Sequence, residues 1–242
     1  MGNALIGFFL FQPPKHCKKD NGRRHSQVLS KKYCSELWVT NDFGNDIRCF
    51  YIERSRSNVT ILYSHANAED IPSISYWLYY LAKELKVSIM AYDYSGYGES
   101  DGEPSENNCY ADIDAVYHHL VCNMNKLPKN IVLFGRSLGS GPTCYLASRT
   151  SQEERPVGGV ILHSAFTSIY RIVADLGCTM RGDVFPNVDY LNFFDAETPV
   201  LVVHGTSDCI VPFQHGKNLV TALPHVTTVE TFFVEGLVRK SR

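Results

Sequence analysis

The stretch NIVLFGRSLGSG (residues 130–141) passes from an apolar run typical of a buried strand to small residues that suit the start of a helix. Its centre follows the pattern Gly-x-Ser-x-Gly, in which Gly135 and Gly139 leave room for a sharp turn with Ser137 at its tip. Such a turn strains the backbone and projects the serine hydroxyl from the edge of a sheet. Two interpretations are open at this point: a nucleophile elbow, or an ordinary strand-turn-helix connection in which the serine caps the helix.

Strand-like and helix-like segments alternate on both sides of this stretch. Near-continuous apolar runs predict strands at 59–64, 87–92, 131–136, 157–162, 198–204 and 227–234, and helical spacing predicts helices at 71–86, 106–124, 137–149 and 213–223. Two shorter runs, 36–40 and 47–53, flank a turn-rich cluster and predict an antiparallel hairpin. The alternation predicts an α/β fold with a mostly parallel sheet covered by helices on both faces.

The regular alternation fails between residues 164 and 194, where aromatic residues, Gly and Pro surround one expected short helix. A long irregular excursion of this kind is usually functional, so we expect it to act as a lid that shapes an apolar pocket. The sequence therefore predicts an N-terminal segment at 1–35 and one large domain at 36–242 that carries this excursion.

Polar turns follow four of the predicted parallel strands, and the carboxyl ends of such strands form the usual ligand-binding edge of a sheet. Ser137 is the candidate nucleophile, and Asp208 is the candidate acid that orients a catalytic base. The main-chain N–H groups of Leu138 and Asn67 are the candidate oxyanion donors. Asp93 also follows a strand of this set. The alternative for Asp208 is a structural Asx turn or helix cap.

The catalytic histidine of such a site is expected in a loop after the last strand, but the residues after Gly236 read LVRKSR. The last histidine of the chain, His225, precedes that strand. His163 and His204 end strands at the predicted catalytic edge and are interpreted as structural, and His118, His119 and His215 fall on predicted helices. We therefore expect impaired turnover, because a serine without a base is a weak nucleophile.

The composition is that of an ordinary globular protein, and a formal net charge of −2 gives no general attraction to nucleic acid. The eight cysteines include no CxxC pair and no metal-ligand spacing, so we expect reduced thiols and no bound metal. No apolar run approaches the roughly 20 residues that cross a bilayer. These features predict a cytoplasmic protein, with peripheral attachment to the cytoplasmic face of a membrane as an extension of that prediction.

The N-terminal segment is the candidate for membrane attachment. Residues 1–11 (MGNALIGFFLF) are apolar but too short to span a membrane, and they lack the features of a secretory signal. Gly2 suggests N-myristoylation, while the basic run that follows and palmitoylation of Cys17 would supply a second membrane signal. The alternative is that the apolar residues pack on the domain and the basic run is a solvated loop.

Five blocks between Tyr63 and Gly236 carry a family resemblance: LYSHANAED, AYDYSGYGESDGEPSENNCYADIDA, LFGRSLGSGPT, VFPNVDYL and PVLVVHGTSDCIVPFQHG. The chain resembles the alpha/beta-hydrolase domain 17 group of protein depalmitoylases and their Bem46-like relatives, within the serine peptidase S33-like superfamily. The resemblance implies an alpha/beta-hydrolase fold and a serine hydrolase of acyl thioesters on membrane-associated proteins, or of lipid esters, without metal or cofactor. A general carboxylesterase and a non-catalytic acyl-binding or regulatory protein are the alternatives.

The chain departs from the pattern of that group in two places. The group carries a cluster of N-terminal cysteines, whereas this chain has only Cys17 and Cys34 among its basic residues. The group's pattern also continues past Gly236 through the histidine loop to a final helix. We interpret the change after Gly236 as a truncated gene model, an intron read-through or an alternative isoform.

Overall fold

The computed structural model describes residues 10–14, 33–173, 182–224 and 228–236. The chain divides into two compact units, Met1–Met124 and Asn125–Arg242. Most of the predicted N-terminal segment, including Gly2 and Cys17, lies outside the described residues. Among the helices that are described, none combines the length and the apolar character that a membrane span requires.

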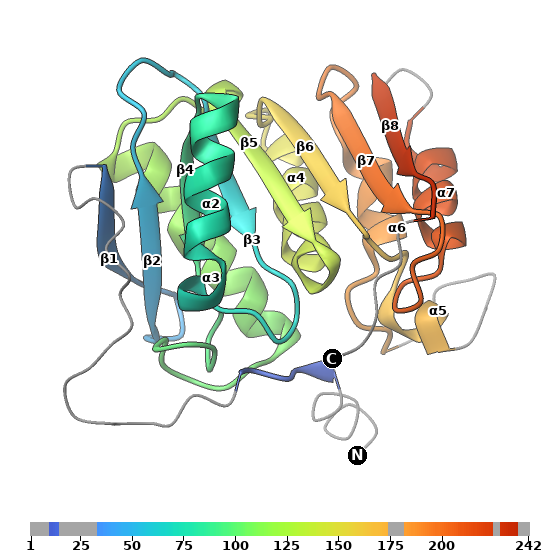
Figure 1. Cartoon of the computed structure of the whole chain (residues 1–242), viewed down its shortest axis with the longest axis horizontal. Coiled ribbons are helices and arrows are strands. Elements are labelled where there is room, and N and C mark those ends of the chain that lie inside the picture. Colours follow the sequence, from blue (N-terminus) through green and yellow to red (C-terminus); the bar gives the residue numbers. More distant parts are fainter. Residues whose placement is uncertain (1–9, 15–32, 174–181, 225–227, 237–242) are drawn as a thin grey trace. The chain divides into compact units, whose positions relative to one another are not determined.

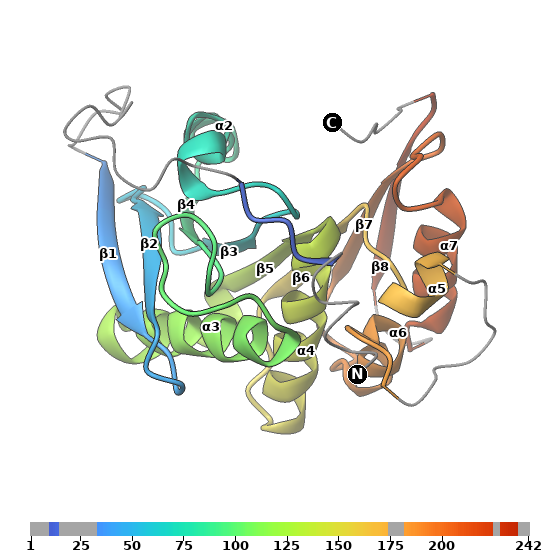
Figure 2. The same cartoon turned by 90° about the horizontal axis from the view of Figure 1, so that it is seen from below.

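The first unit is a four-stranded sheet with a helix on each face. Its elements are β1 (Cys34–Thr40), β2 (Asp46–Ile52), β3 (Thr60–Ser64), α2 (Ile71–Leu85), β4 (Ser88–Tyr92), α3 (Glu106–His118) and a π-helical turn at His119–Asn123. The strands lie in the order β1-β2-β4-β3, with β3 and β4 parallel and the other two pairs antiparallel. Figures 1 and 2 show α2 on one face of this sheet and α3 on the other.

Both helices of the first unit begin at side chains that satisfy their free N–H groups. Asp70 accepts a hydrogen bond from the N–H of Ser73 at 3.0 Å, and the Ser73 hydroxyl accepts one from the N–H of Asp70, which is a capping box. Ser105 caps α3 by accepting from the N–H of Asn108 at 3.1 Å. These caps fix where each strand-to-helix loop ends.

The second unit contains a parallel four-stranded sheet. Its elements are β5 (Ile131–Arg136), α4 (Ser140–Gln152), β6 (Gly159–His163), α5 (Ile169–Val173), α6 (Asn187–Tyr190), β7 (Val200–Gly205), α7 (Phe213–Ala222) and β8 (Val229–Val234), with short 3₁₀ turns at Pro128–Asn130, Ser137–Gly139 and Leu191–Phe193. The strands follow the order β5-β6-β7-β8, and each neighbouring pair is parallel (Figure 1). The helix α4 contacts β5 and β6, and α7 contacts β7.

The predicted α/β class, the N-terminal hairpin and the mostly parallel arrangement of the strands are confirmed. The expectation of one short helix within 164–194 was wrong, because the described part of that excursion holds α5 and α6. These helices have five and four residues, which is too short for helical periodicity to show in the sequence.

The turn after β4 buries a carboxyl group in the first unit. Asp93 is fully buried and accepts a hydrogen bond from the N–H of Ile71 at 2.7 Å. Gly98, at φ +54°, packs so closely on this carboxyl group that a Cβ atom there would overlap it. The buried His65 ring lies 3.8 Å from Asp93, measured from Nε2 to Oδ1. Burial raises the pKa of Asp93 to about 7, although the hydrogen bond from the N–H of Ile71 acts in the opposite direction. Burial also lowers the pKa of His65.

The raised pKa of Asp93 gives a first testable prediction, because the sign of its effect on stability is defined. Between about pH 4 and pH 7 the folded state keeps a proton on Asp93 that the unfolded chain has lost, so the free energy of unfolding falls as the pH rises. The slope from this group is at most about 1.4 kcal/mol per pH unit. We expect Asp93→Asn, which keeps an acceptor for Ile71, to lose this slope.

Urea unfolding of the wild type and the variant at intervals from pH 4 to pH 8 measures the difference. Asp112, whose pKa burial raises to about 6, contributes a slope of the same sign in both proteins, and His65 contributes one of opposite sign below about pH 6.5. The exposed Asp42, changed to Asn, is the matched control. Parallel pH profiles for wild type and Asp93→Asn would contradict the prediction.

Candidate active site

The backbone at Ser137 has the geometry of a nucleophile elbow. Ser137 follows β5 directly, has φ +52° and begins the 3₁₀ turn that leads into α4. A Cβ atom at Gly135 would lie 2.5 Å from the carbonyl oxygen of Gly139 and 2.8 Å from the Cα of Ser140. The helix can approach the strand this closely only because Gly135 has no side chain. The predicted strand-turn-helix geometry is present, while the role of Ser137 as nucleophile stays a prediction.

A chain of buried hydrogen bonds connects the elbow to the excursion that follows β6. The Ser140 hydroxyl donates to the carbonyl oxygen of Ser137 at 2.6 Å. The side-chain amide of Asn187, at the start of α6, donates to Ser140 Oγ at 3.0 Å and to the carbonyl oxygen of Phe166 at 2.9 Å. Asn187 and Ser140 are fully buried. Neither residue is recognisable as part of the site from the sequence, since neither the composition of the excursion nor its spacing indicates them.

Asp208 lies in the loop after β7, at the same edge of the parallel sheet as Ser137. Its Oδ1 accepts hydrogen bonds from the N–H groups of Ile210 at 2.8 Å and Val211 at 3.0 Å, which is an Asx-turn arrangement. Within the described residues, Oδ2 accepts no hydrogen bond. The Asx turn therefore uses only Oδ1 of Asp208. The predicted role of Asp208, to orient an imidazole by accepting its N–H, would use Oδ2.

The described histidines of the second unit bond to groups other than Ser137 and Asp208. His204, which is fully buried, pairs through Nε2 with the carbonyl oxygen of Val211 at 2.9 Å. His215 on α7 accepts through Nδ1 from the N–H of Thr167 at 3.3 Å and pairs with the Thr167 hydroxyl at 2.9 Å. The His163 ring faces Phe134 at a centroid distance of 6.3 Å. Among the described residues, no hydrogen bond joins a histidine to Ser137 or Asp208.

The two predicted oxyanion donors lie at the carboxyl ends of strands in different units. Leu138 is the second residue of the turn that opens the elbow helix, where main-chain N–H groups have no partner within the helix. Asn67 follows β3 in the first unit. The neighbouring N–H groups of this loop are occupied: Ala66 donates to Glu69 Oε2 at 3.0 Å, and Ala68 donates to the Asn67 side chain at 3.1 Å. The main-chain N–H of Asn67 has no such partner among the described residues.

Residues 59–180, half of the chain, match the family described as "alpha/beta hydrolase fold". The chain belongs to the alpha/beta hydrolase family. It is 38% identical over 201 residues to alpha/beta hydrolase domain-containing protein 17C of Xenopus tropicalis, covering 82% of this chain and 62% of that protein. It is 37% identical over 195 residues to human alpha/beta hydrolase domain-containing protein 17B, covering 80% and 65%. The chain thus spans about three fifths of the length of these curated relatives.

Solved structures share the fold of this alpha/beta hydrolase at low sequence identity. An alpha-beta hydrolase from Vibrio vulnificus matches with a TM-score of 0.68 and 21% identity, covering 84% of this chain and 75% of that chain. An esterase from Pyrococcus furiosus matches with a TM-score of 0.70 and 18% identity, covering 93% and 89%. These similarities show the α/β-hydrolase fold.

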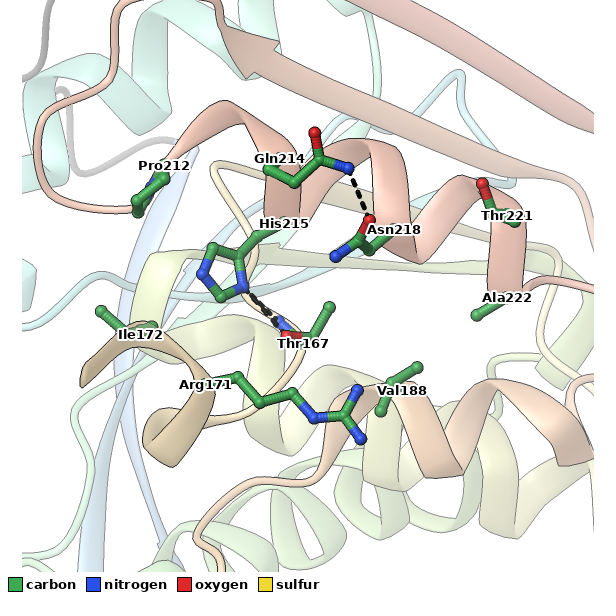
Figure 3. A pocket seen from close by; sticks show the side chains of 10 residues that line it. All are labelled: Thr167, Arg171, Ile172, Val188, Pro212, Gln214, His215, Asn218, Thr221 and Ala222. Carbon is green, nitrogen blue, oxygen red and sulfur yellow. Dashed lines mark hydrogen bonds between the residues drawn. The ribbon is translucent and has the colours of Figure 1, made fainter. Parts of the chain in front are cut away.

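The second unit contains a cavity of about 470 Å³ between its excursion and α7. Its lining residues are Thr167, Arg171, Ile172, Val188, Pro212, Gln214, His215, Asn218, Thr221 and Ala222 (Figure 3). In Figure 3 the Thr167–His215 pair lies on one side of this space, between α7 and the loop after β6. Residues of the excursion at 164–194 line this cavity together with α7, and the action of the excursion as a lid stays a prediction.

The Asn187 hydrogen bonds give a testable prediction for the elbow. In Asn187→Asp the donor nitrogen becomes an oxygen that faces the carbonyl oxygen of Phe166, so two hydrogen bonds are lost and a buried charge is left unpaired. We expect the free energy of unfolding, measured with urea at pH 7.5, to fall by roughly 3 kcal/mol.

The matched control for this prediction is Asn192→Asp. Asn192 makes the same kind of bond, from Nδ2 to the carbonyl oxygen of Asp189 at 3.2 Å, but it is exposed. Its substitution should change the stability by less than about 0.5 kcal/mol. Equal losses in the two variants would show that Asn187 does not brace the elbow.

Proposed function

We propose that this chain has the fold of a serine hydrolase that cleaves acyl thioesters or lipid esters, and that Ser137 forms the acyl-enzyme. The observation that carries the proposal is the backbone of Ser137, which stands at φ +52° between β5 and the helix packed on Gly135. A strained serine at the carboxyl end of a parallel strand has a structural cost, and such strain is typical of catalytic sites.

In the proposed reaction, Ser137 Oγ attacks the acyl carbonyl carbon, and the proton of the hydroxyl passes to an imidazole base. The new C–O bond forms a tetrahedral intermediate whose oxyanion is stabilised by the N–H groups of Leu138 and Asn67. The C–S or C–O bond to the leaving group then breaks, and the base gives its proton to the departing thiol or alcohol. A water molecule then gives a proton to the same base and attacks the acyl carbonyl carbon. The C–O bond to Ser137 breaks, and the base returns its proton to Ser137 Oγ, which releases the carboxylic acid. Asp208 Oδ2 orients the base.

The substrate class is the finer part of the proposal. Four of the ten residues that line the cavity between the excursion and α7 are apolar, and neither Ser137 nor Asp208 is among the ten, so the cavity does not by itself select an acyl ligand. The proposal for an acyl substrate rests on the five sequence blocks quoted above. We propose an acylated protein as substrate, with the N-terminal segment making peripheral contact with the cytoplasmic face of a membrane. A general carboxylesterase is the second candidate within the enzyme class.

We also propose that turnover of this 242-residue chain is impaired. His204 is hydrogen-bonded to the carbonyl oxygen of Val211, and His215 is hydrogen-bonded to Thr167. No described histidine is hydrogen-bonded to Asp208. The same observations favour the alternative of a non-catalytic acyl-binding protein, which would keep the cavity and lack the base. Chemical rescue distinguishes these two functions.

We expect free imidazole to rescue thioester hydrolysis by this chain, because it can accept the Ser137 proton when placed beside Asp208. Hydrolysis of a palmitoyl thioester by the full chain should be slow without imidazole and should rise saturably, by at least roughly tenfold, as imidazole is added. The Ser137→Ala variant reports the background caused by imidazole itself. A fluorophosphonate probe should label wild type slowly and should leave Ser137→Ala unlabelled.

Each contrary outcome removes a different part of the proposal. Rapid labelling and turnover without imidazole would show that the chain already holds a base. Acyl-ligand binding with no Ser137-dependent turnover at any imidazole concentration would establish the binding alternative.

A further inference from the structure

The side chain of Asn67 binds the main chain of residues 10–12 at two points within the first unit. Its amide nitrogen Nδ2 donates to the carbonyl oxygen of Leu10 at 2.6 Å, and its oxygen Oδ1 accepts from the N–H of Gln12 at 2.9 Å. The two contacted groups flank Phe11. In a parallel β-ladder, one residue offers its N–H and C=O to these same two groups of the facing strand. The Asn67 carboxamide therefore presents a donor and an acceptor as a neighbouring strand would.

The carboxamide of Asn67 has two further contacts that do not involve residues 10–12. Its Oδ1 also accepts from the Tyr97 hydroxyl at 2.7 Å and from the N–H of Ala68 at 3.1 Å. Burial raises the pKa of Tyr97, so its hydroxyl stays a donor over the physiological pH range. The Tyr97 ring is fixed in turn by edge-to-face contact with Tyr94 at a centroid distance of 5.4 Å. Such preorganisation lowers the entropic cost of binding.

The contacts of Asn67 with residues 10–12 involve no side chain of that segment, so hydrogen bonding at this site does not depend on the bound sequence. The Phe11 side chain supplies the apolar part of the interaction, since it is only 8% exposed. Peptide recognition by strand addition likewise combines main-chain hydrogen bonds with a pocket for a side chain, but here the side chain of Asn67 takes the part that a sheet edge plays there.

We propose that Asn67 and Tyr97 form a binding site for the main chain of a polypeptide, occupied in this structure by residues 10–12 of the chain itself. When this segment leaves, the site takes the polypeptide of an acylated protein substrate, with an apolar residue in the place of Phe11. This second statement rests on the proposed function, in which the main-chain N–H of the same Asn67 contacts the acyl oxygen.

The test measures binding of a fluorescent peptide, acetyl-LFQPP-amide with a dye at its C-terminus, to the full chain by anisotropy. In wild type the tethered segment competes at a high effective concentration, so the free peptide should bind weakly. Gln12→Pro removes the N–H that donates to Asn67 Oδ1 and that also bonds to Tyr97, while it changes neither Asn67 nor Tyr97 itself. We expect this variant to bind the peptide roughly tenfold more tightly than wild type does.

Two matched controls distinguish main-chain recognition from non-specific binding of the peptide. A peptide with N-methylglutamine in place of glutamine lacks the single donor to Oδ1, and its affinity for Gln12→Pro should fall roughly tenfold. Tyr97→Phe, added to Gln12→Pro, removes the hydroxyl that positions Oδ1 and that also bonds to the main chain at the place of Gln12, so it should weaken binding of the unmodified peptide. Equal binding to wild type and Gln12→Pro, no binding to either, or indifference to N-methylation would each overturn the site.

A second measurement distinguishes failure of this site from failure of the proposed function. With imidazole present, the LFQPP peptide should inhibit Gln12→Pro acting on a palmitoylated peptide and should spare its hydrolysis of a small ester. Hydrolysis of both substrates without selective inhibition would overturn the substrate role while leaving the hydrolase in place. Peptide binding without hydrolysis of any substrate would overturn the proposed function while leaving the main-chain site in place.

Discussion

The second unit depends on the close approach of α4 to β5, which the missing side chain of Gly135 permits. A non-glycine residue at positive φ costs of order 1–3 kcal/mol, so the surroundings must hold Ser137 in place. Part of that support comes from the excursion after β6. Phe185 fills the space beside Gly141, where a Cβ atom would lie 2.3 Å from the ring, and Asn187 reaches Ser140. The excursion therefore braces the elbow as well as lining a cavity.

The fold was predictable to the extent that it depends on local patterns. Buried strands such as β3 and β4 are continuous apolar runs, and Asp70 and Ser105 mark helix starts by residue type. The contents of the excursion were not predictable, since helices of four or five residues have no visible period. Asn187 is recognisable only through its contacts, because an asparagine after a proline reads as an ordinary turn residue in the sequence.

The same limit applies to the predicted site residues. Asp208 had two sequence interpretations, and the hydrogen bonds show that they are compatible, because the Asx turn uses Oδ1 and leaves Oδ2. His204 had the right position at a strand end for a catalytic role. Its burial and its bond to Val211 make it a structural residue, as expected. Sequence spacing places a side chain at an edge of the sheet, but only packing determines which of its atoms are available.

Asn67 illustrates how one residue links two parts of a site. Its side chain binds a main chain through Leu10 and Gln12, and its own N–H is the proposed oxyanion donor. Because the side chain and that N–H belong to one residue, a chain bound by the carboxamide also restrains the orientation of the N–H. Loss of the bound chain would release two of the four hydrogen bonds of the Asn67 side chain, leaving those from Tyr97 and Ala68. The proposed main-chain site and the proposed oxyanion donor therefore share one residue, and by linkage any coupling between them acts in both directions.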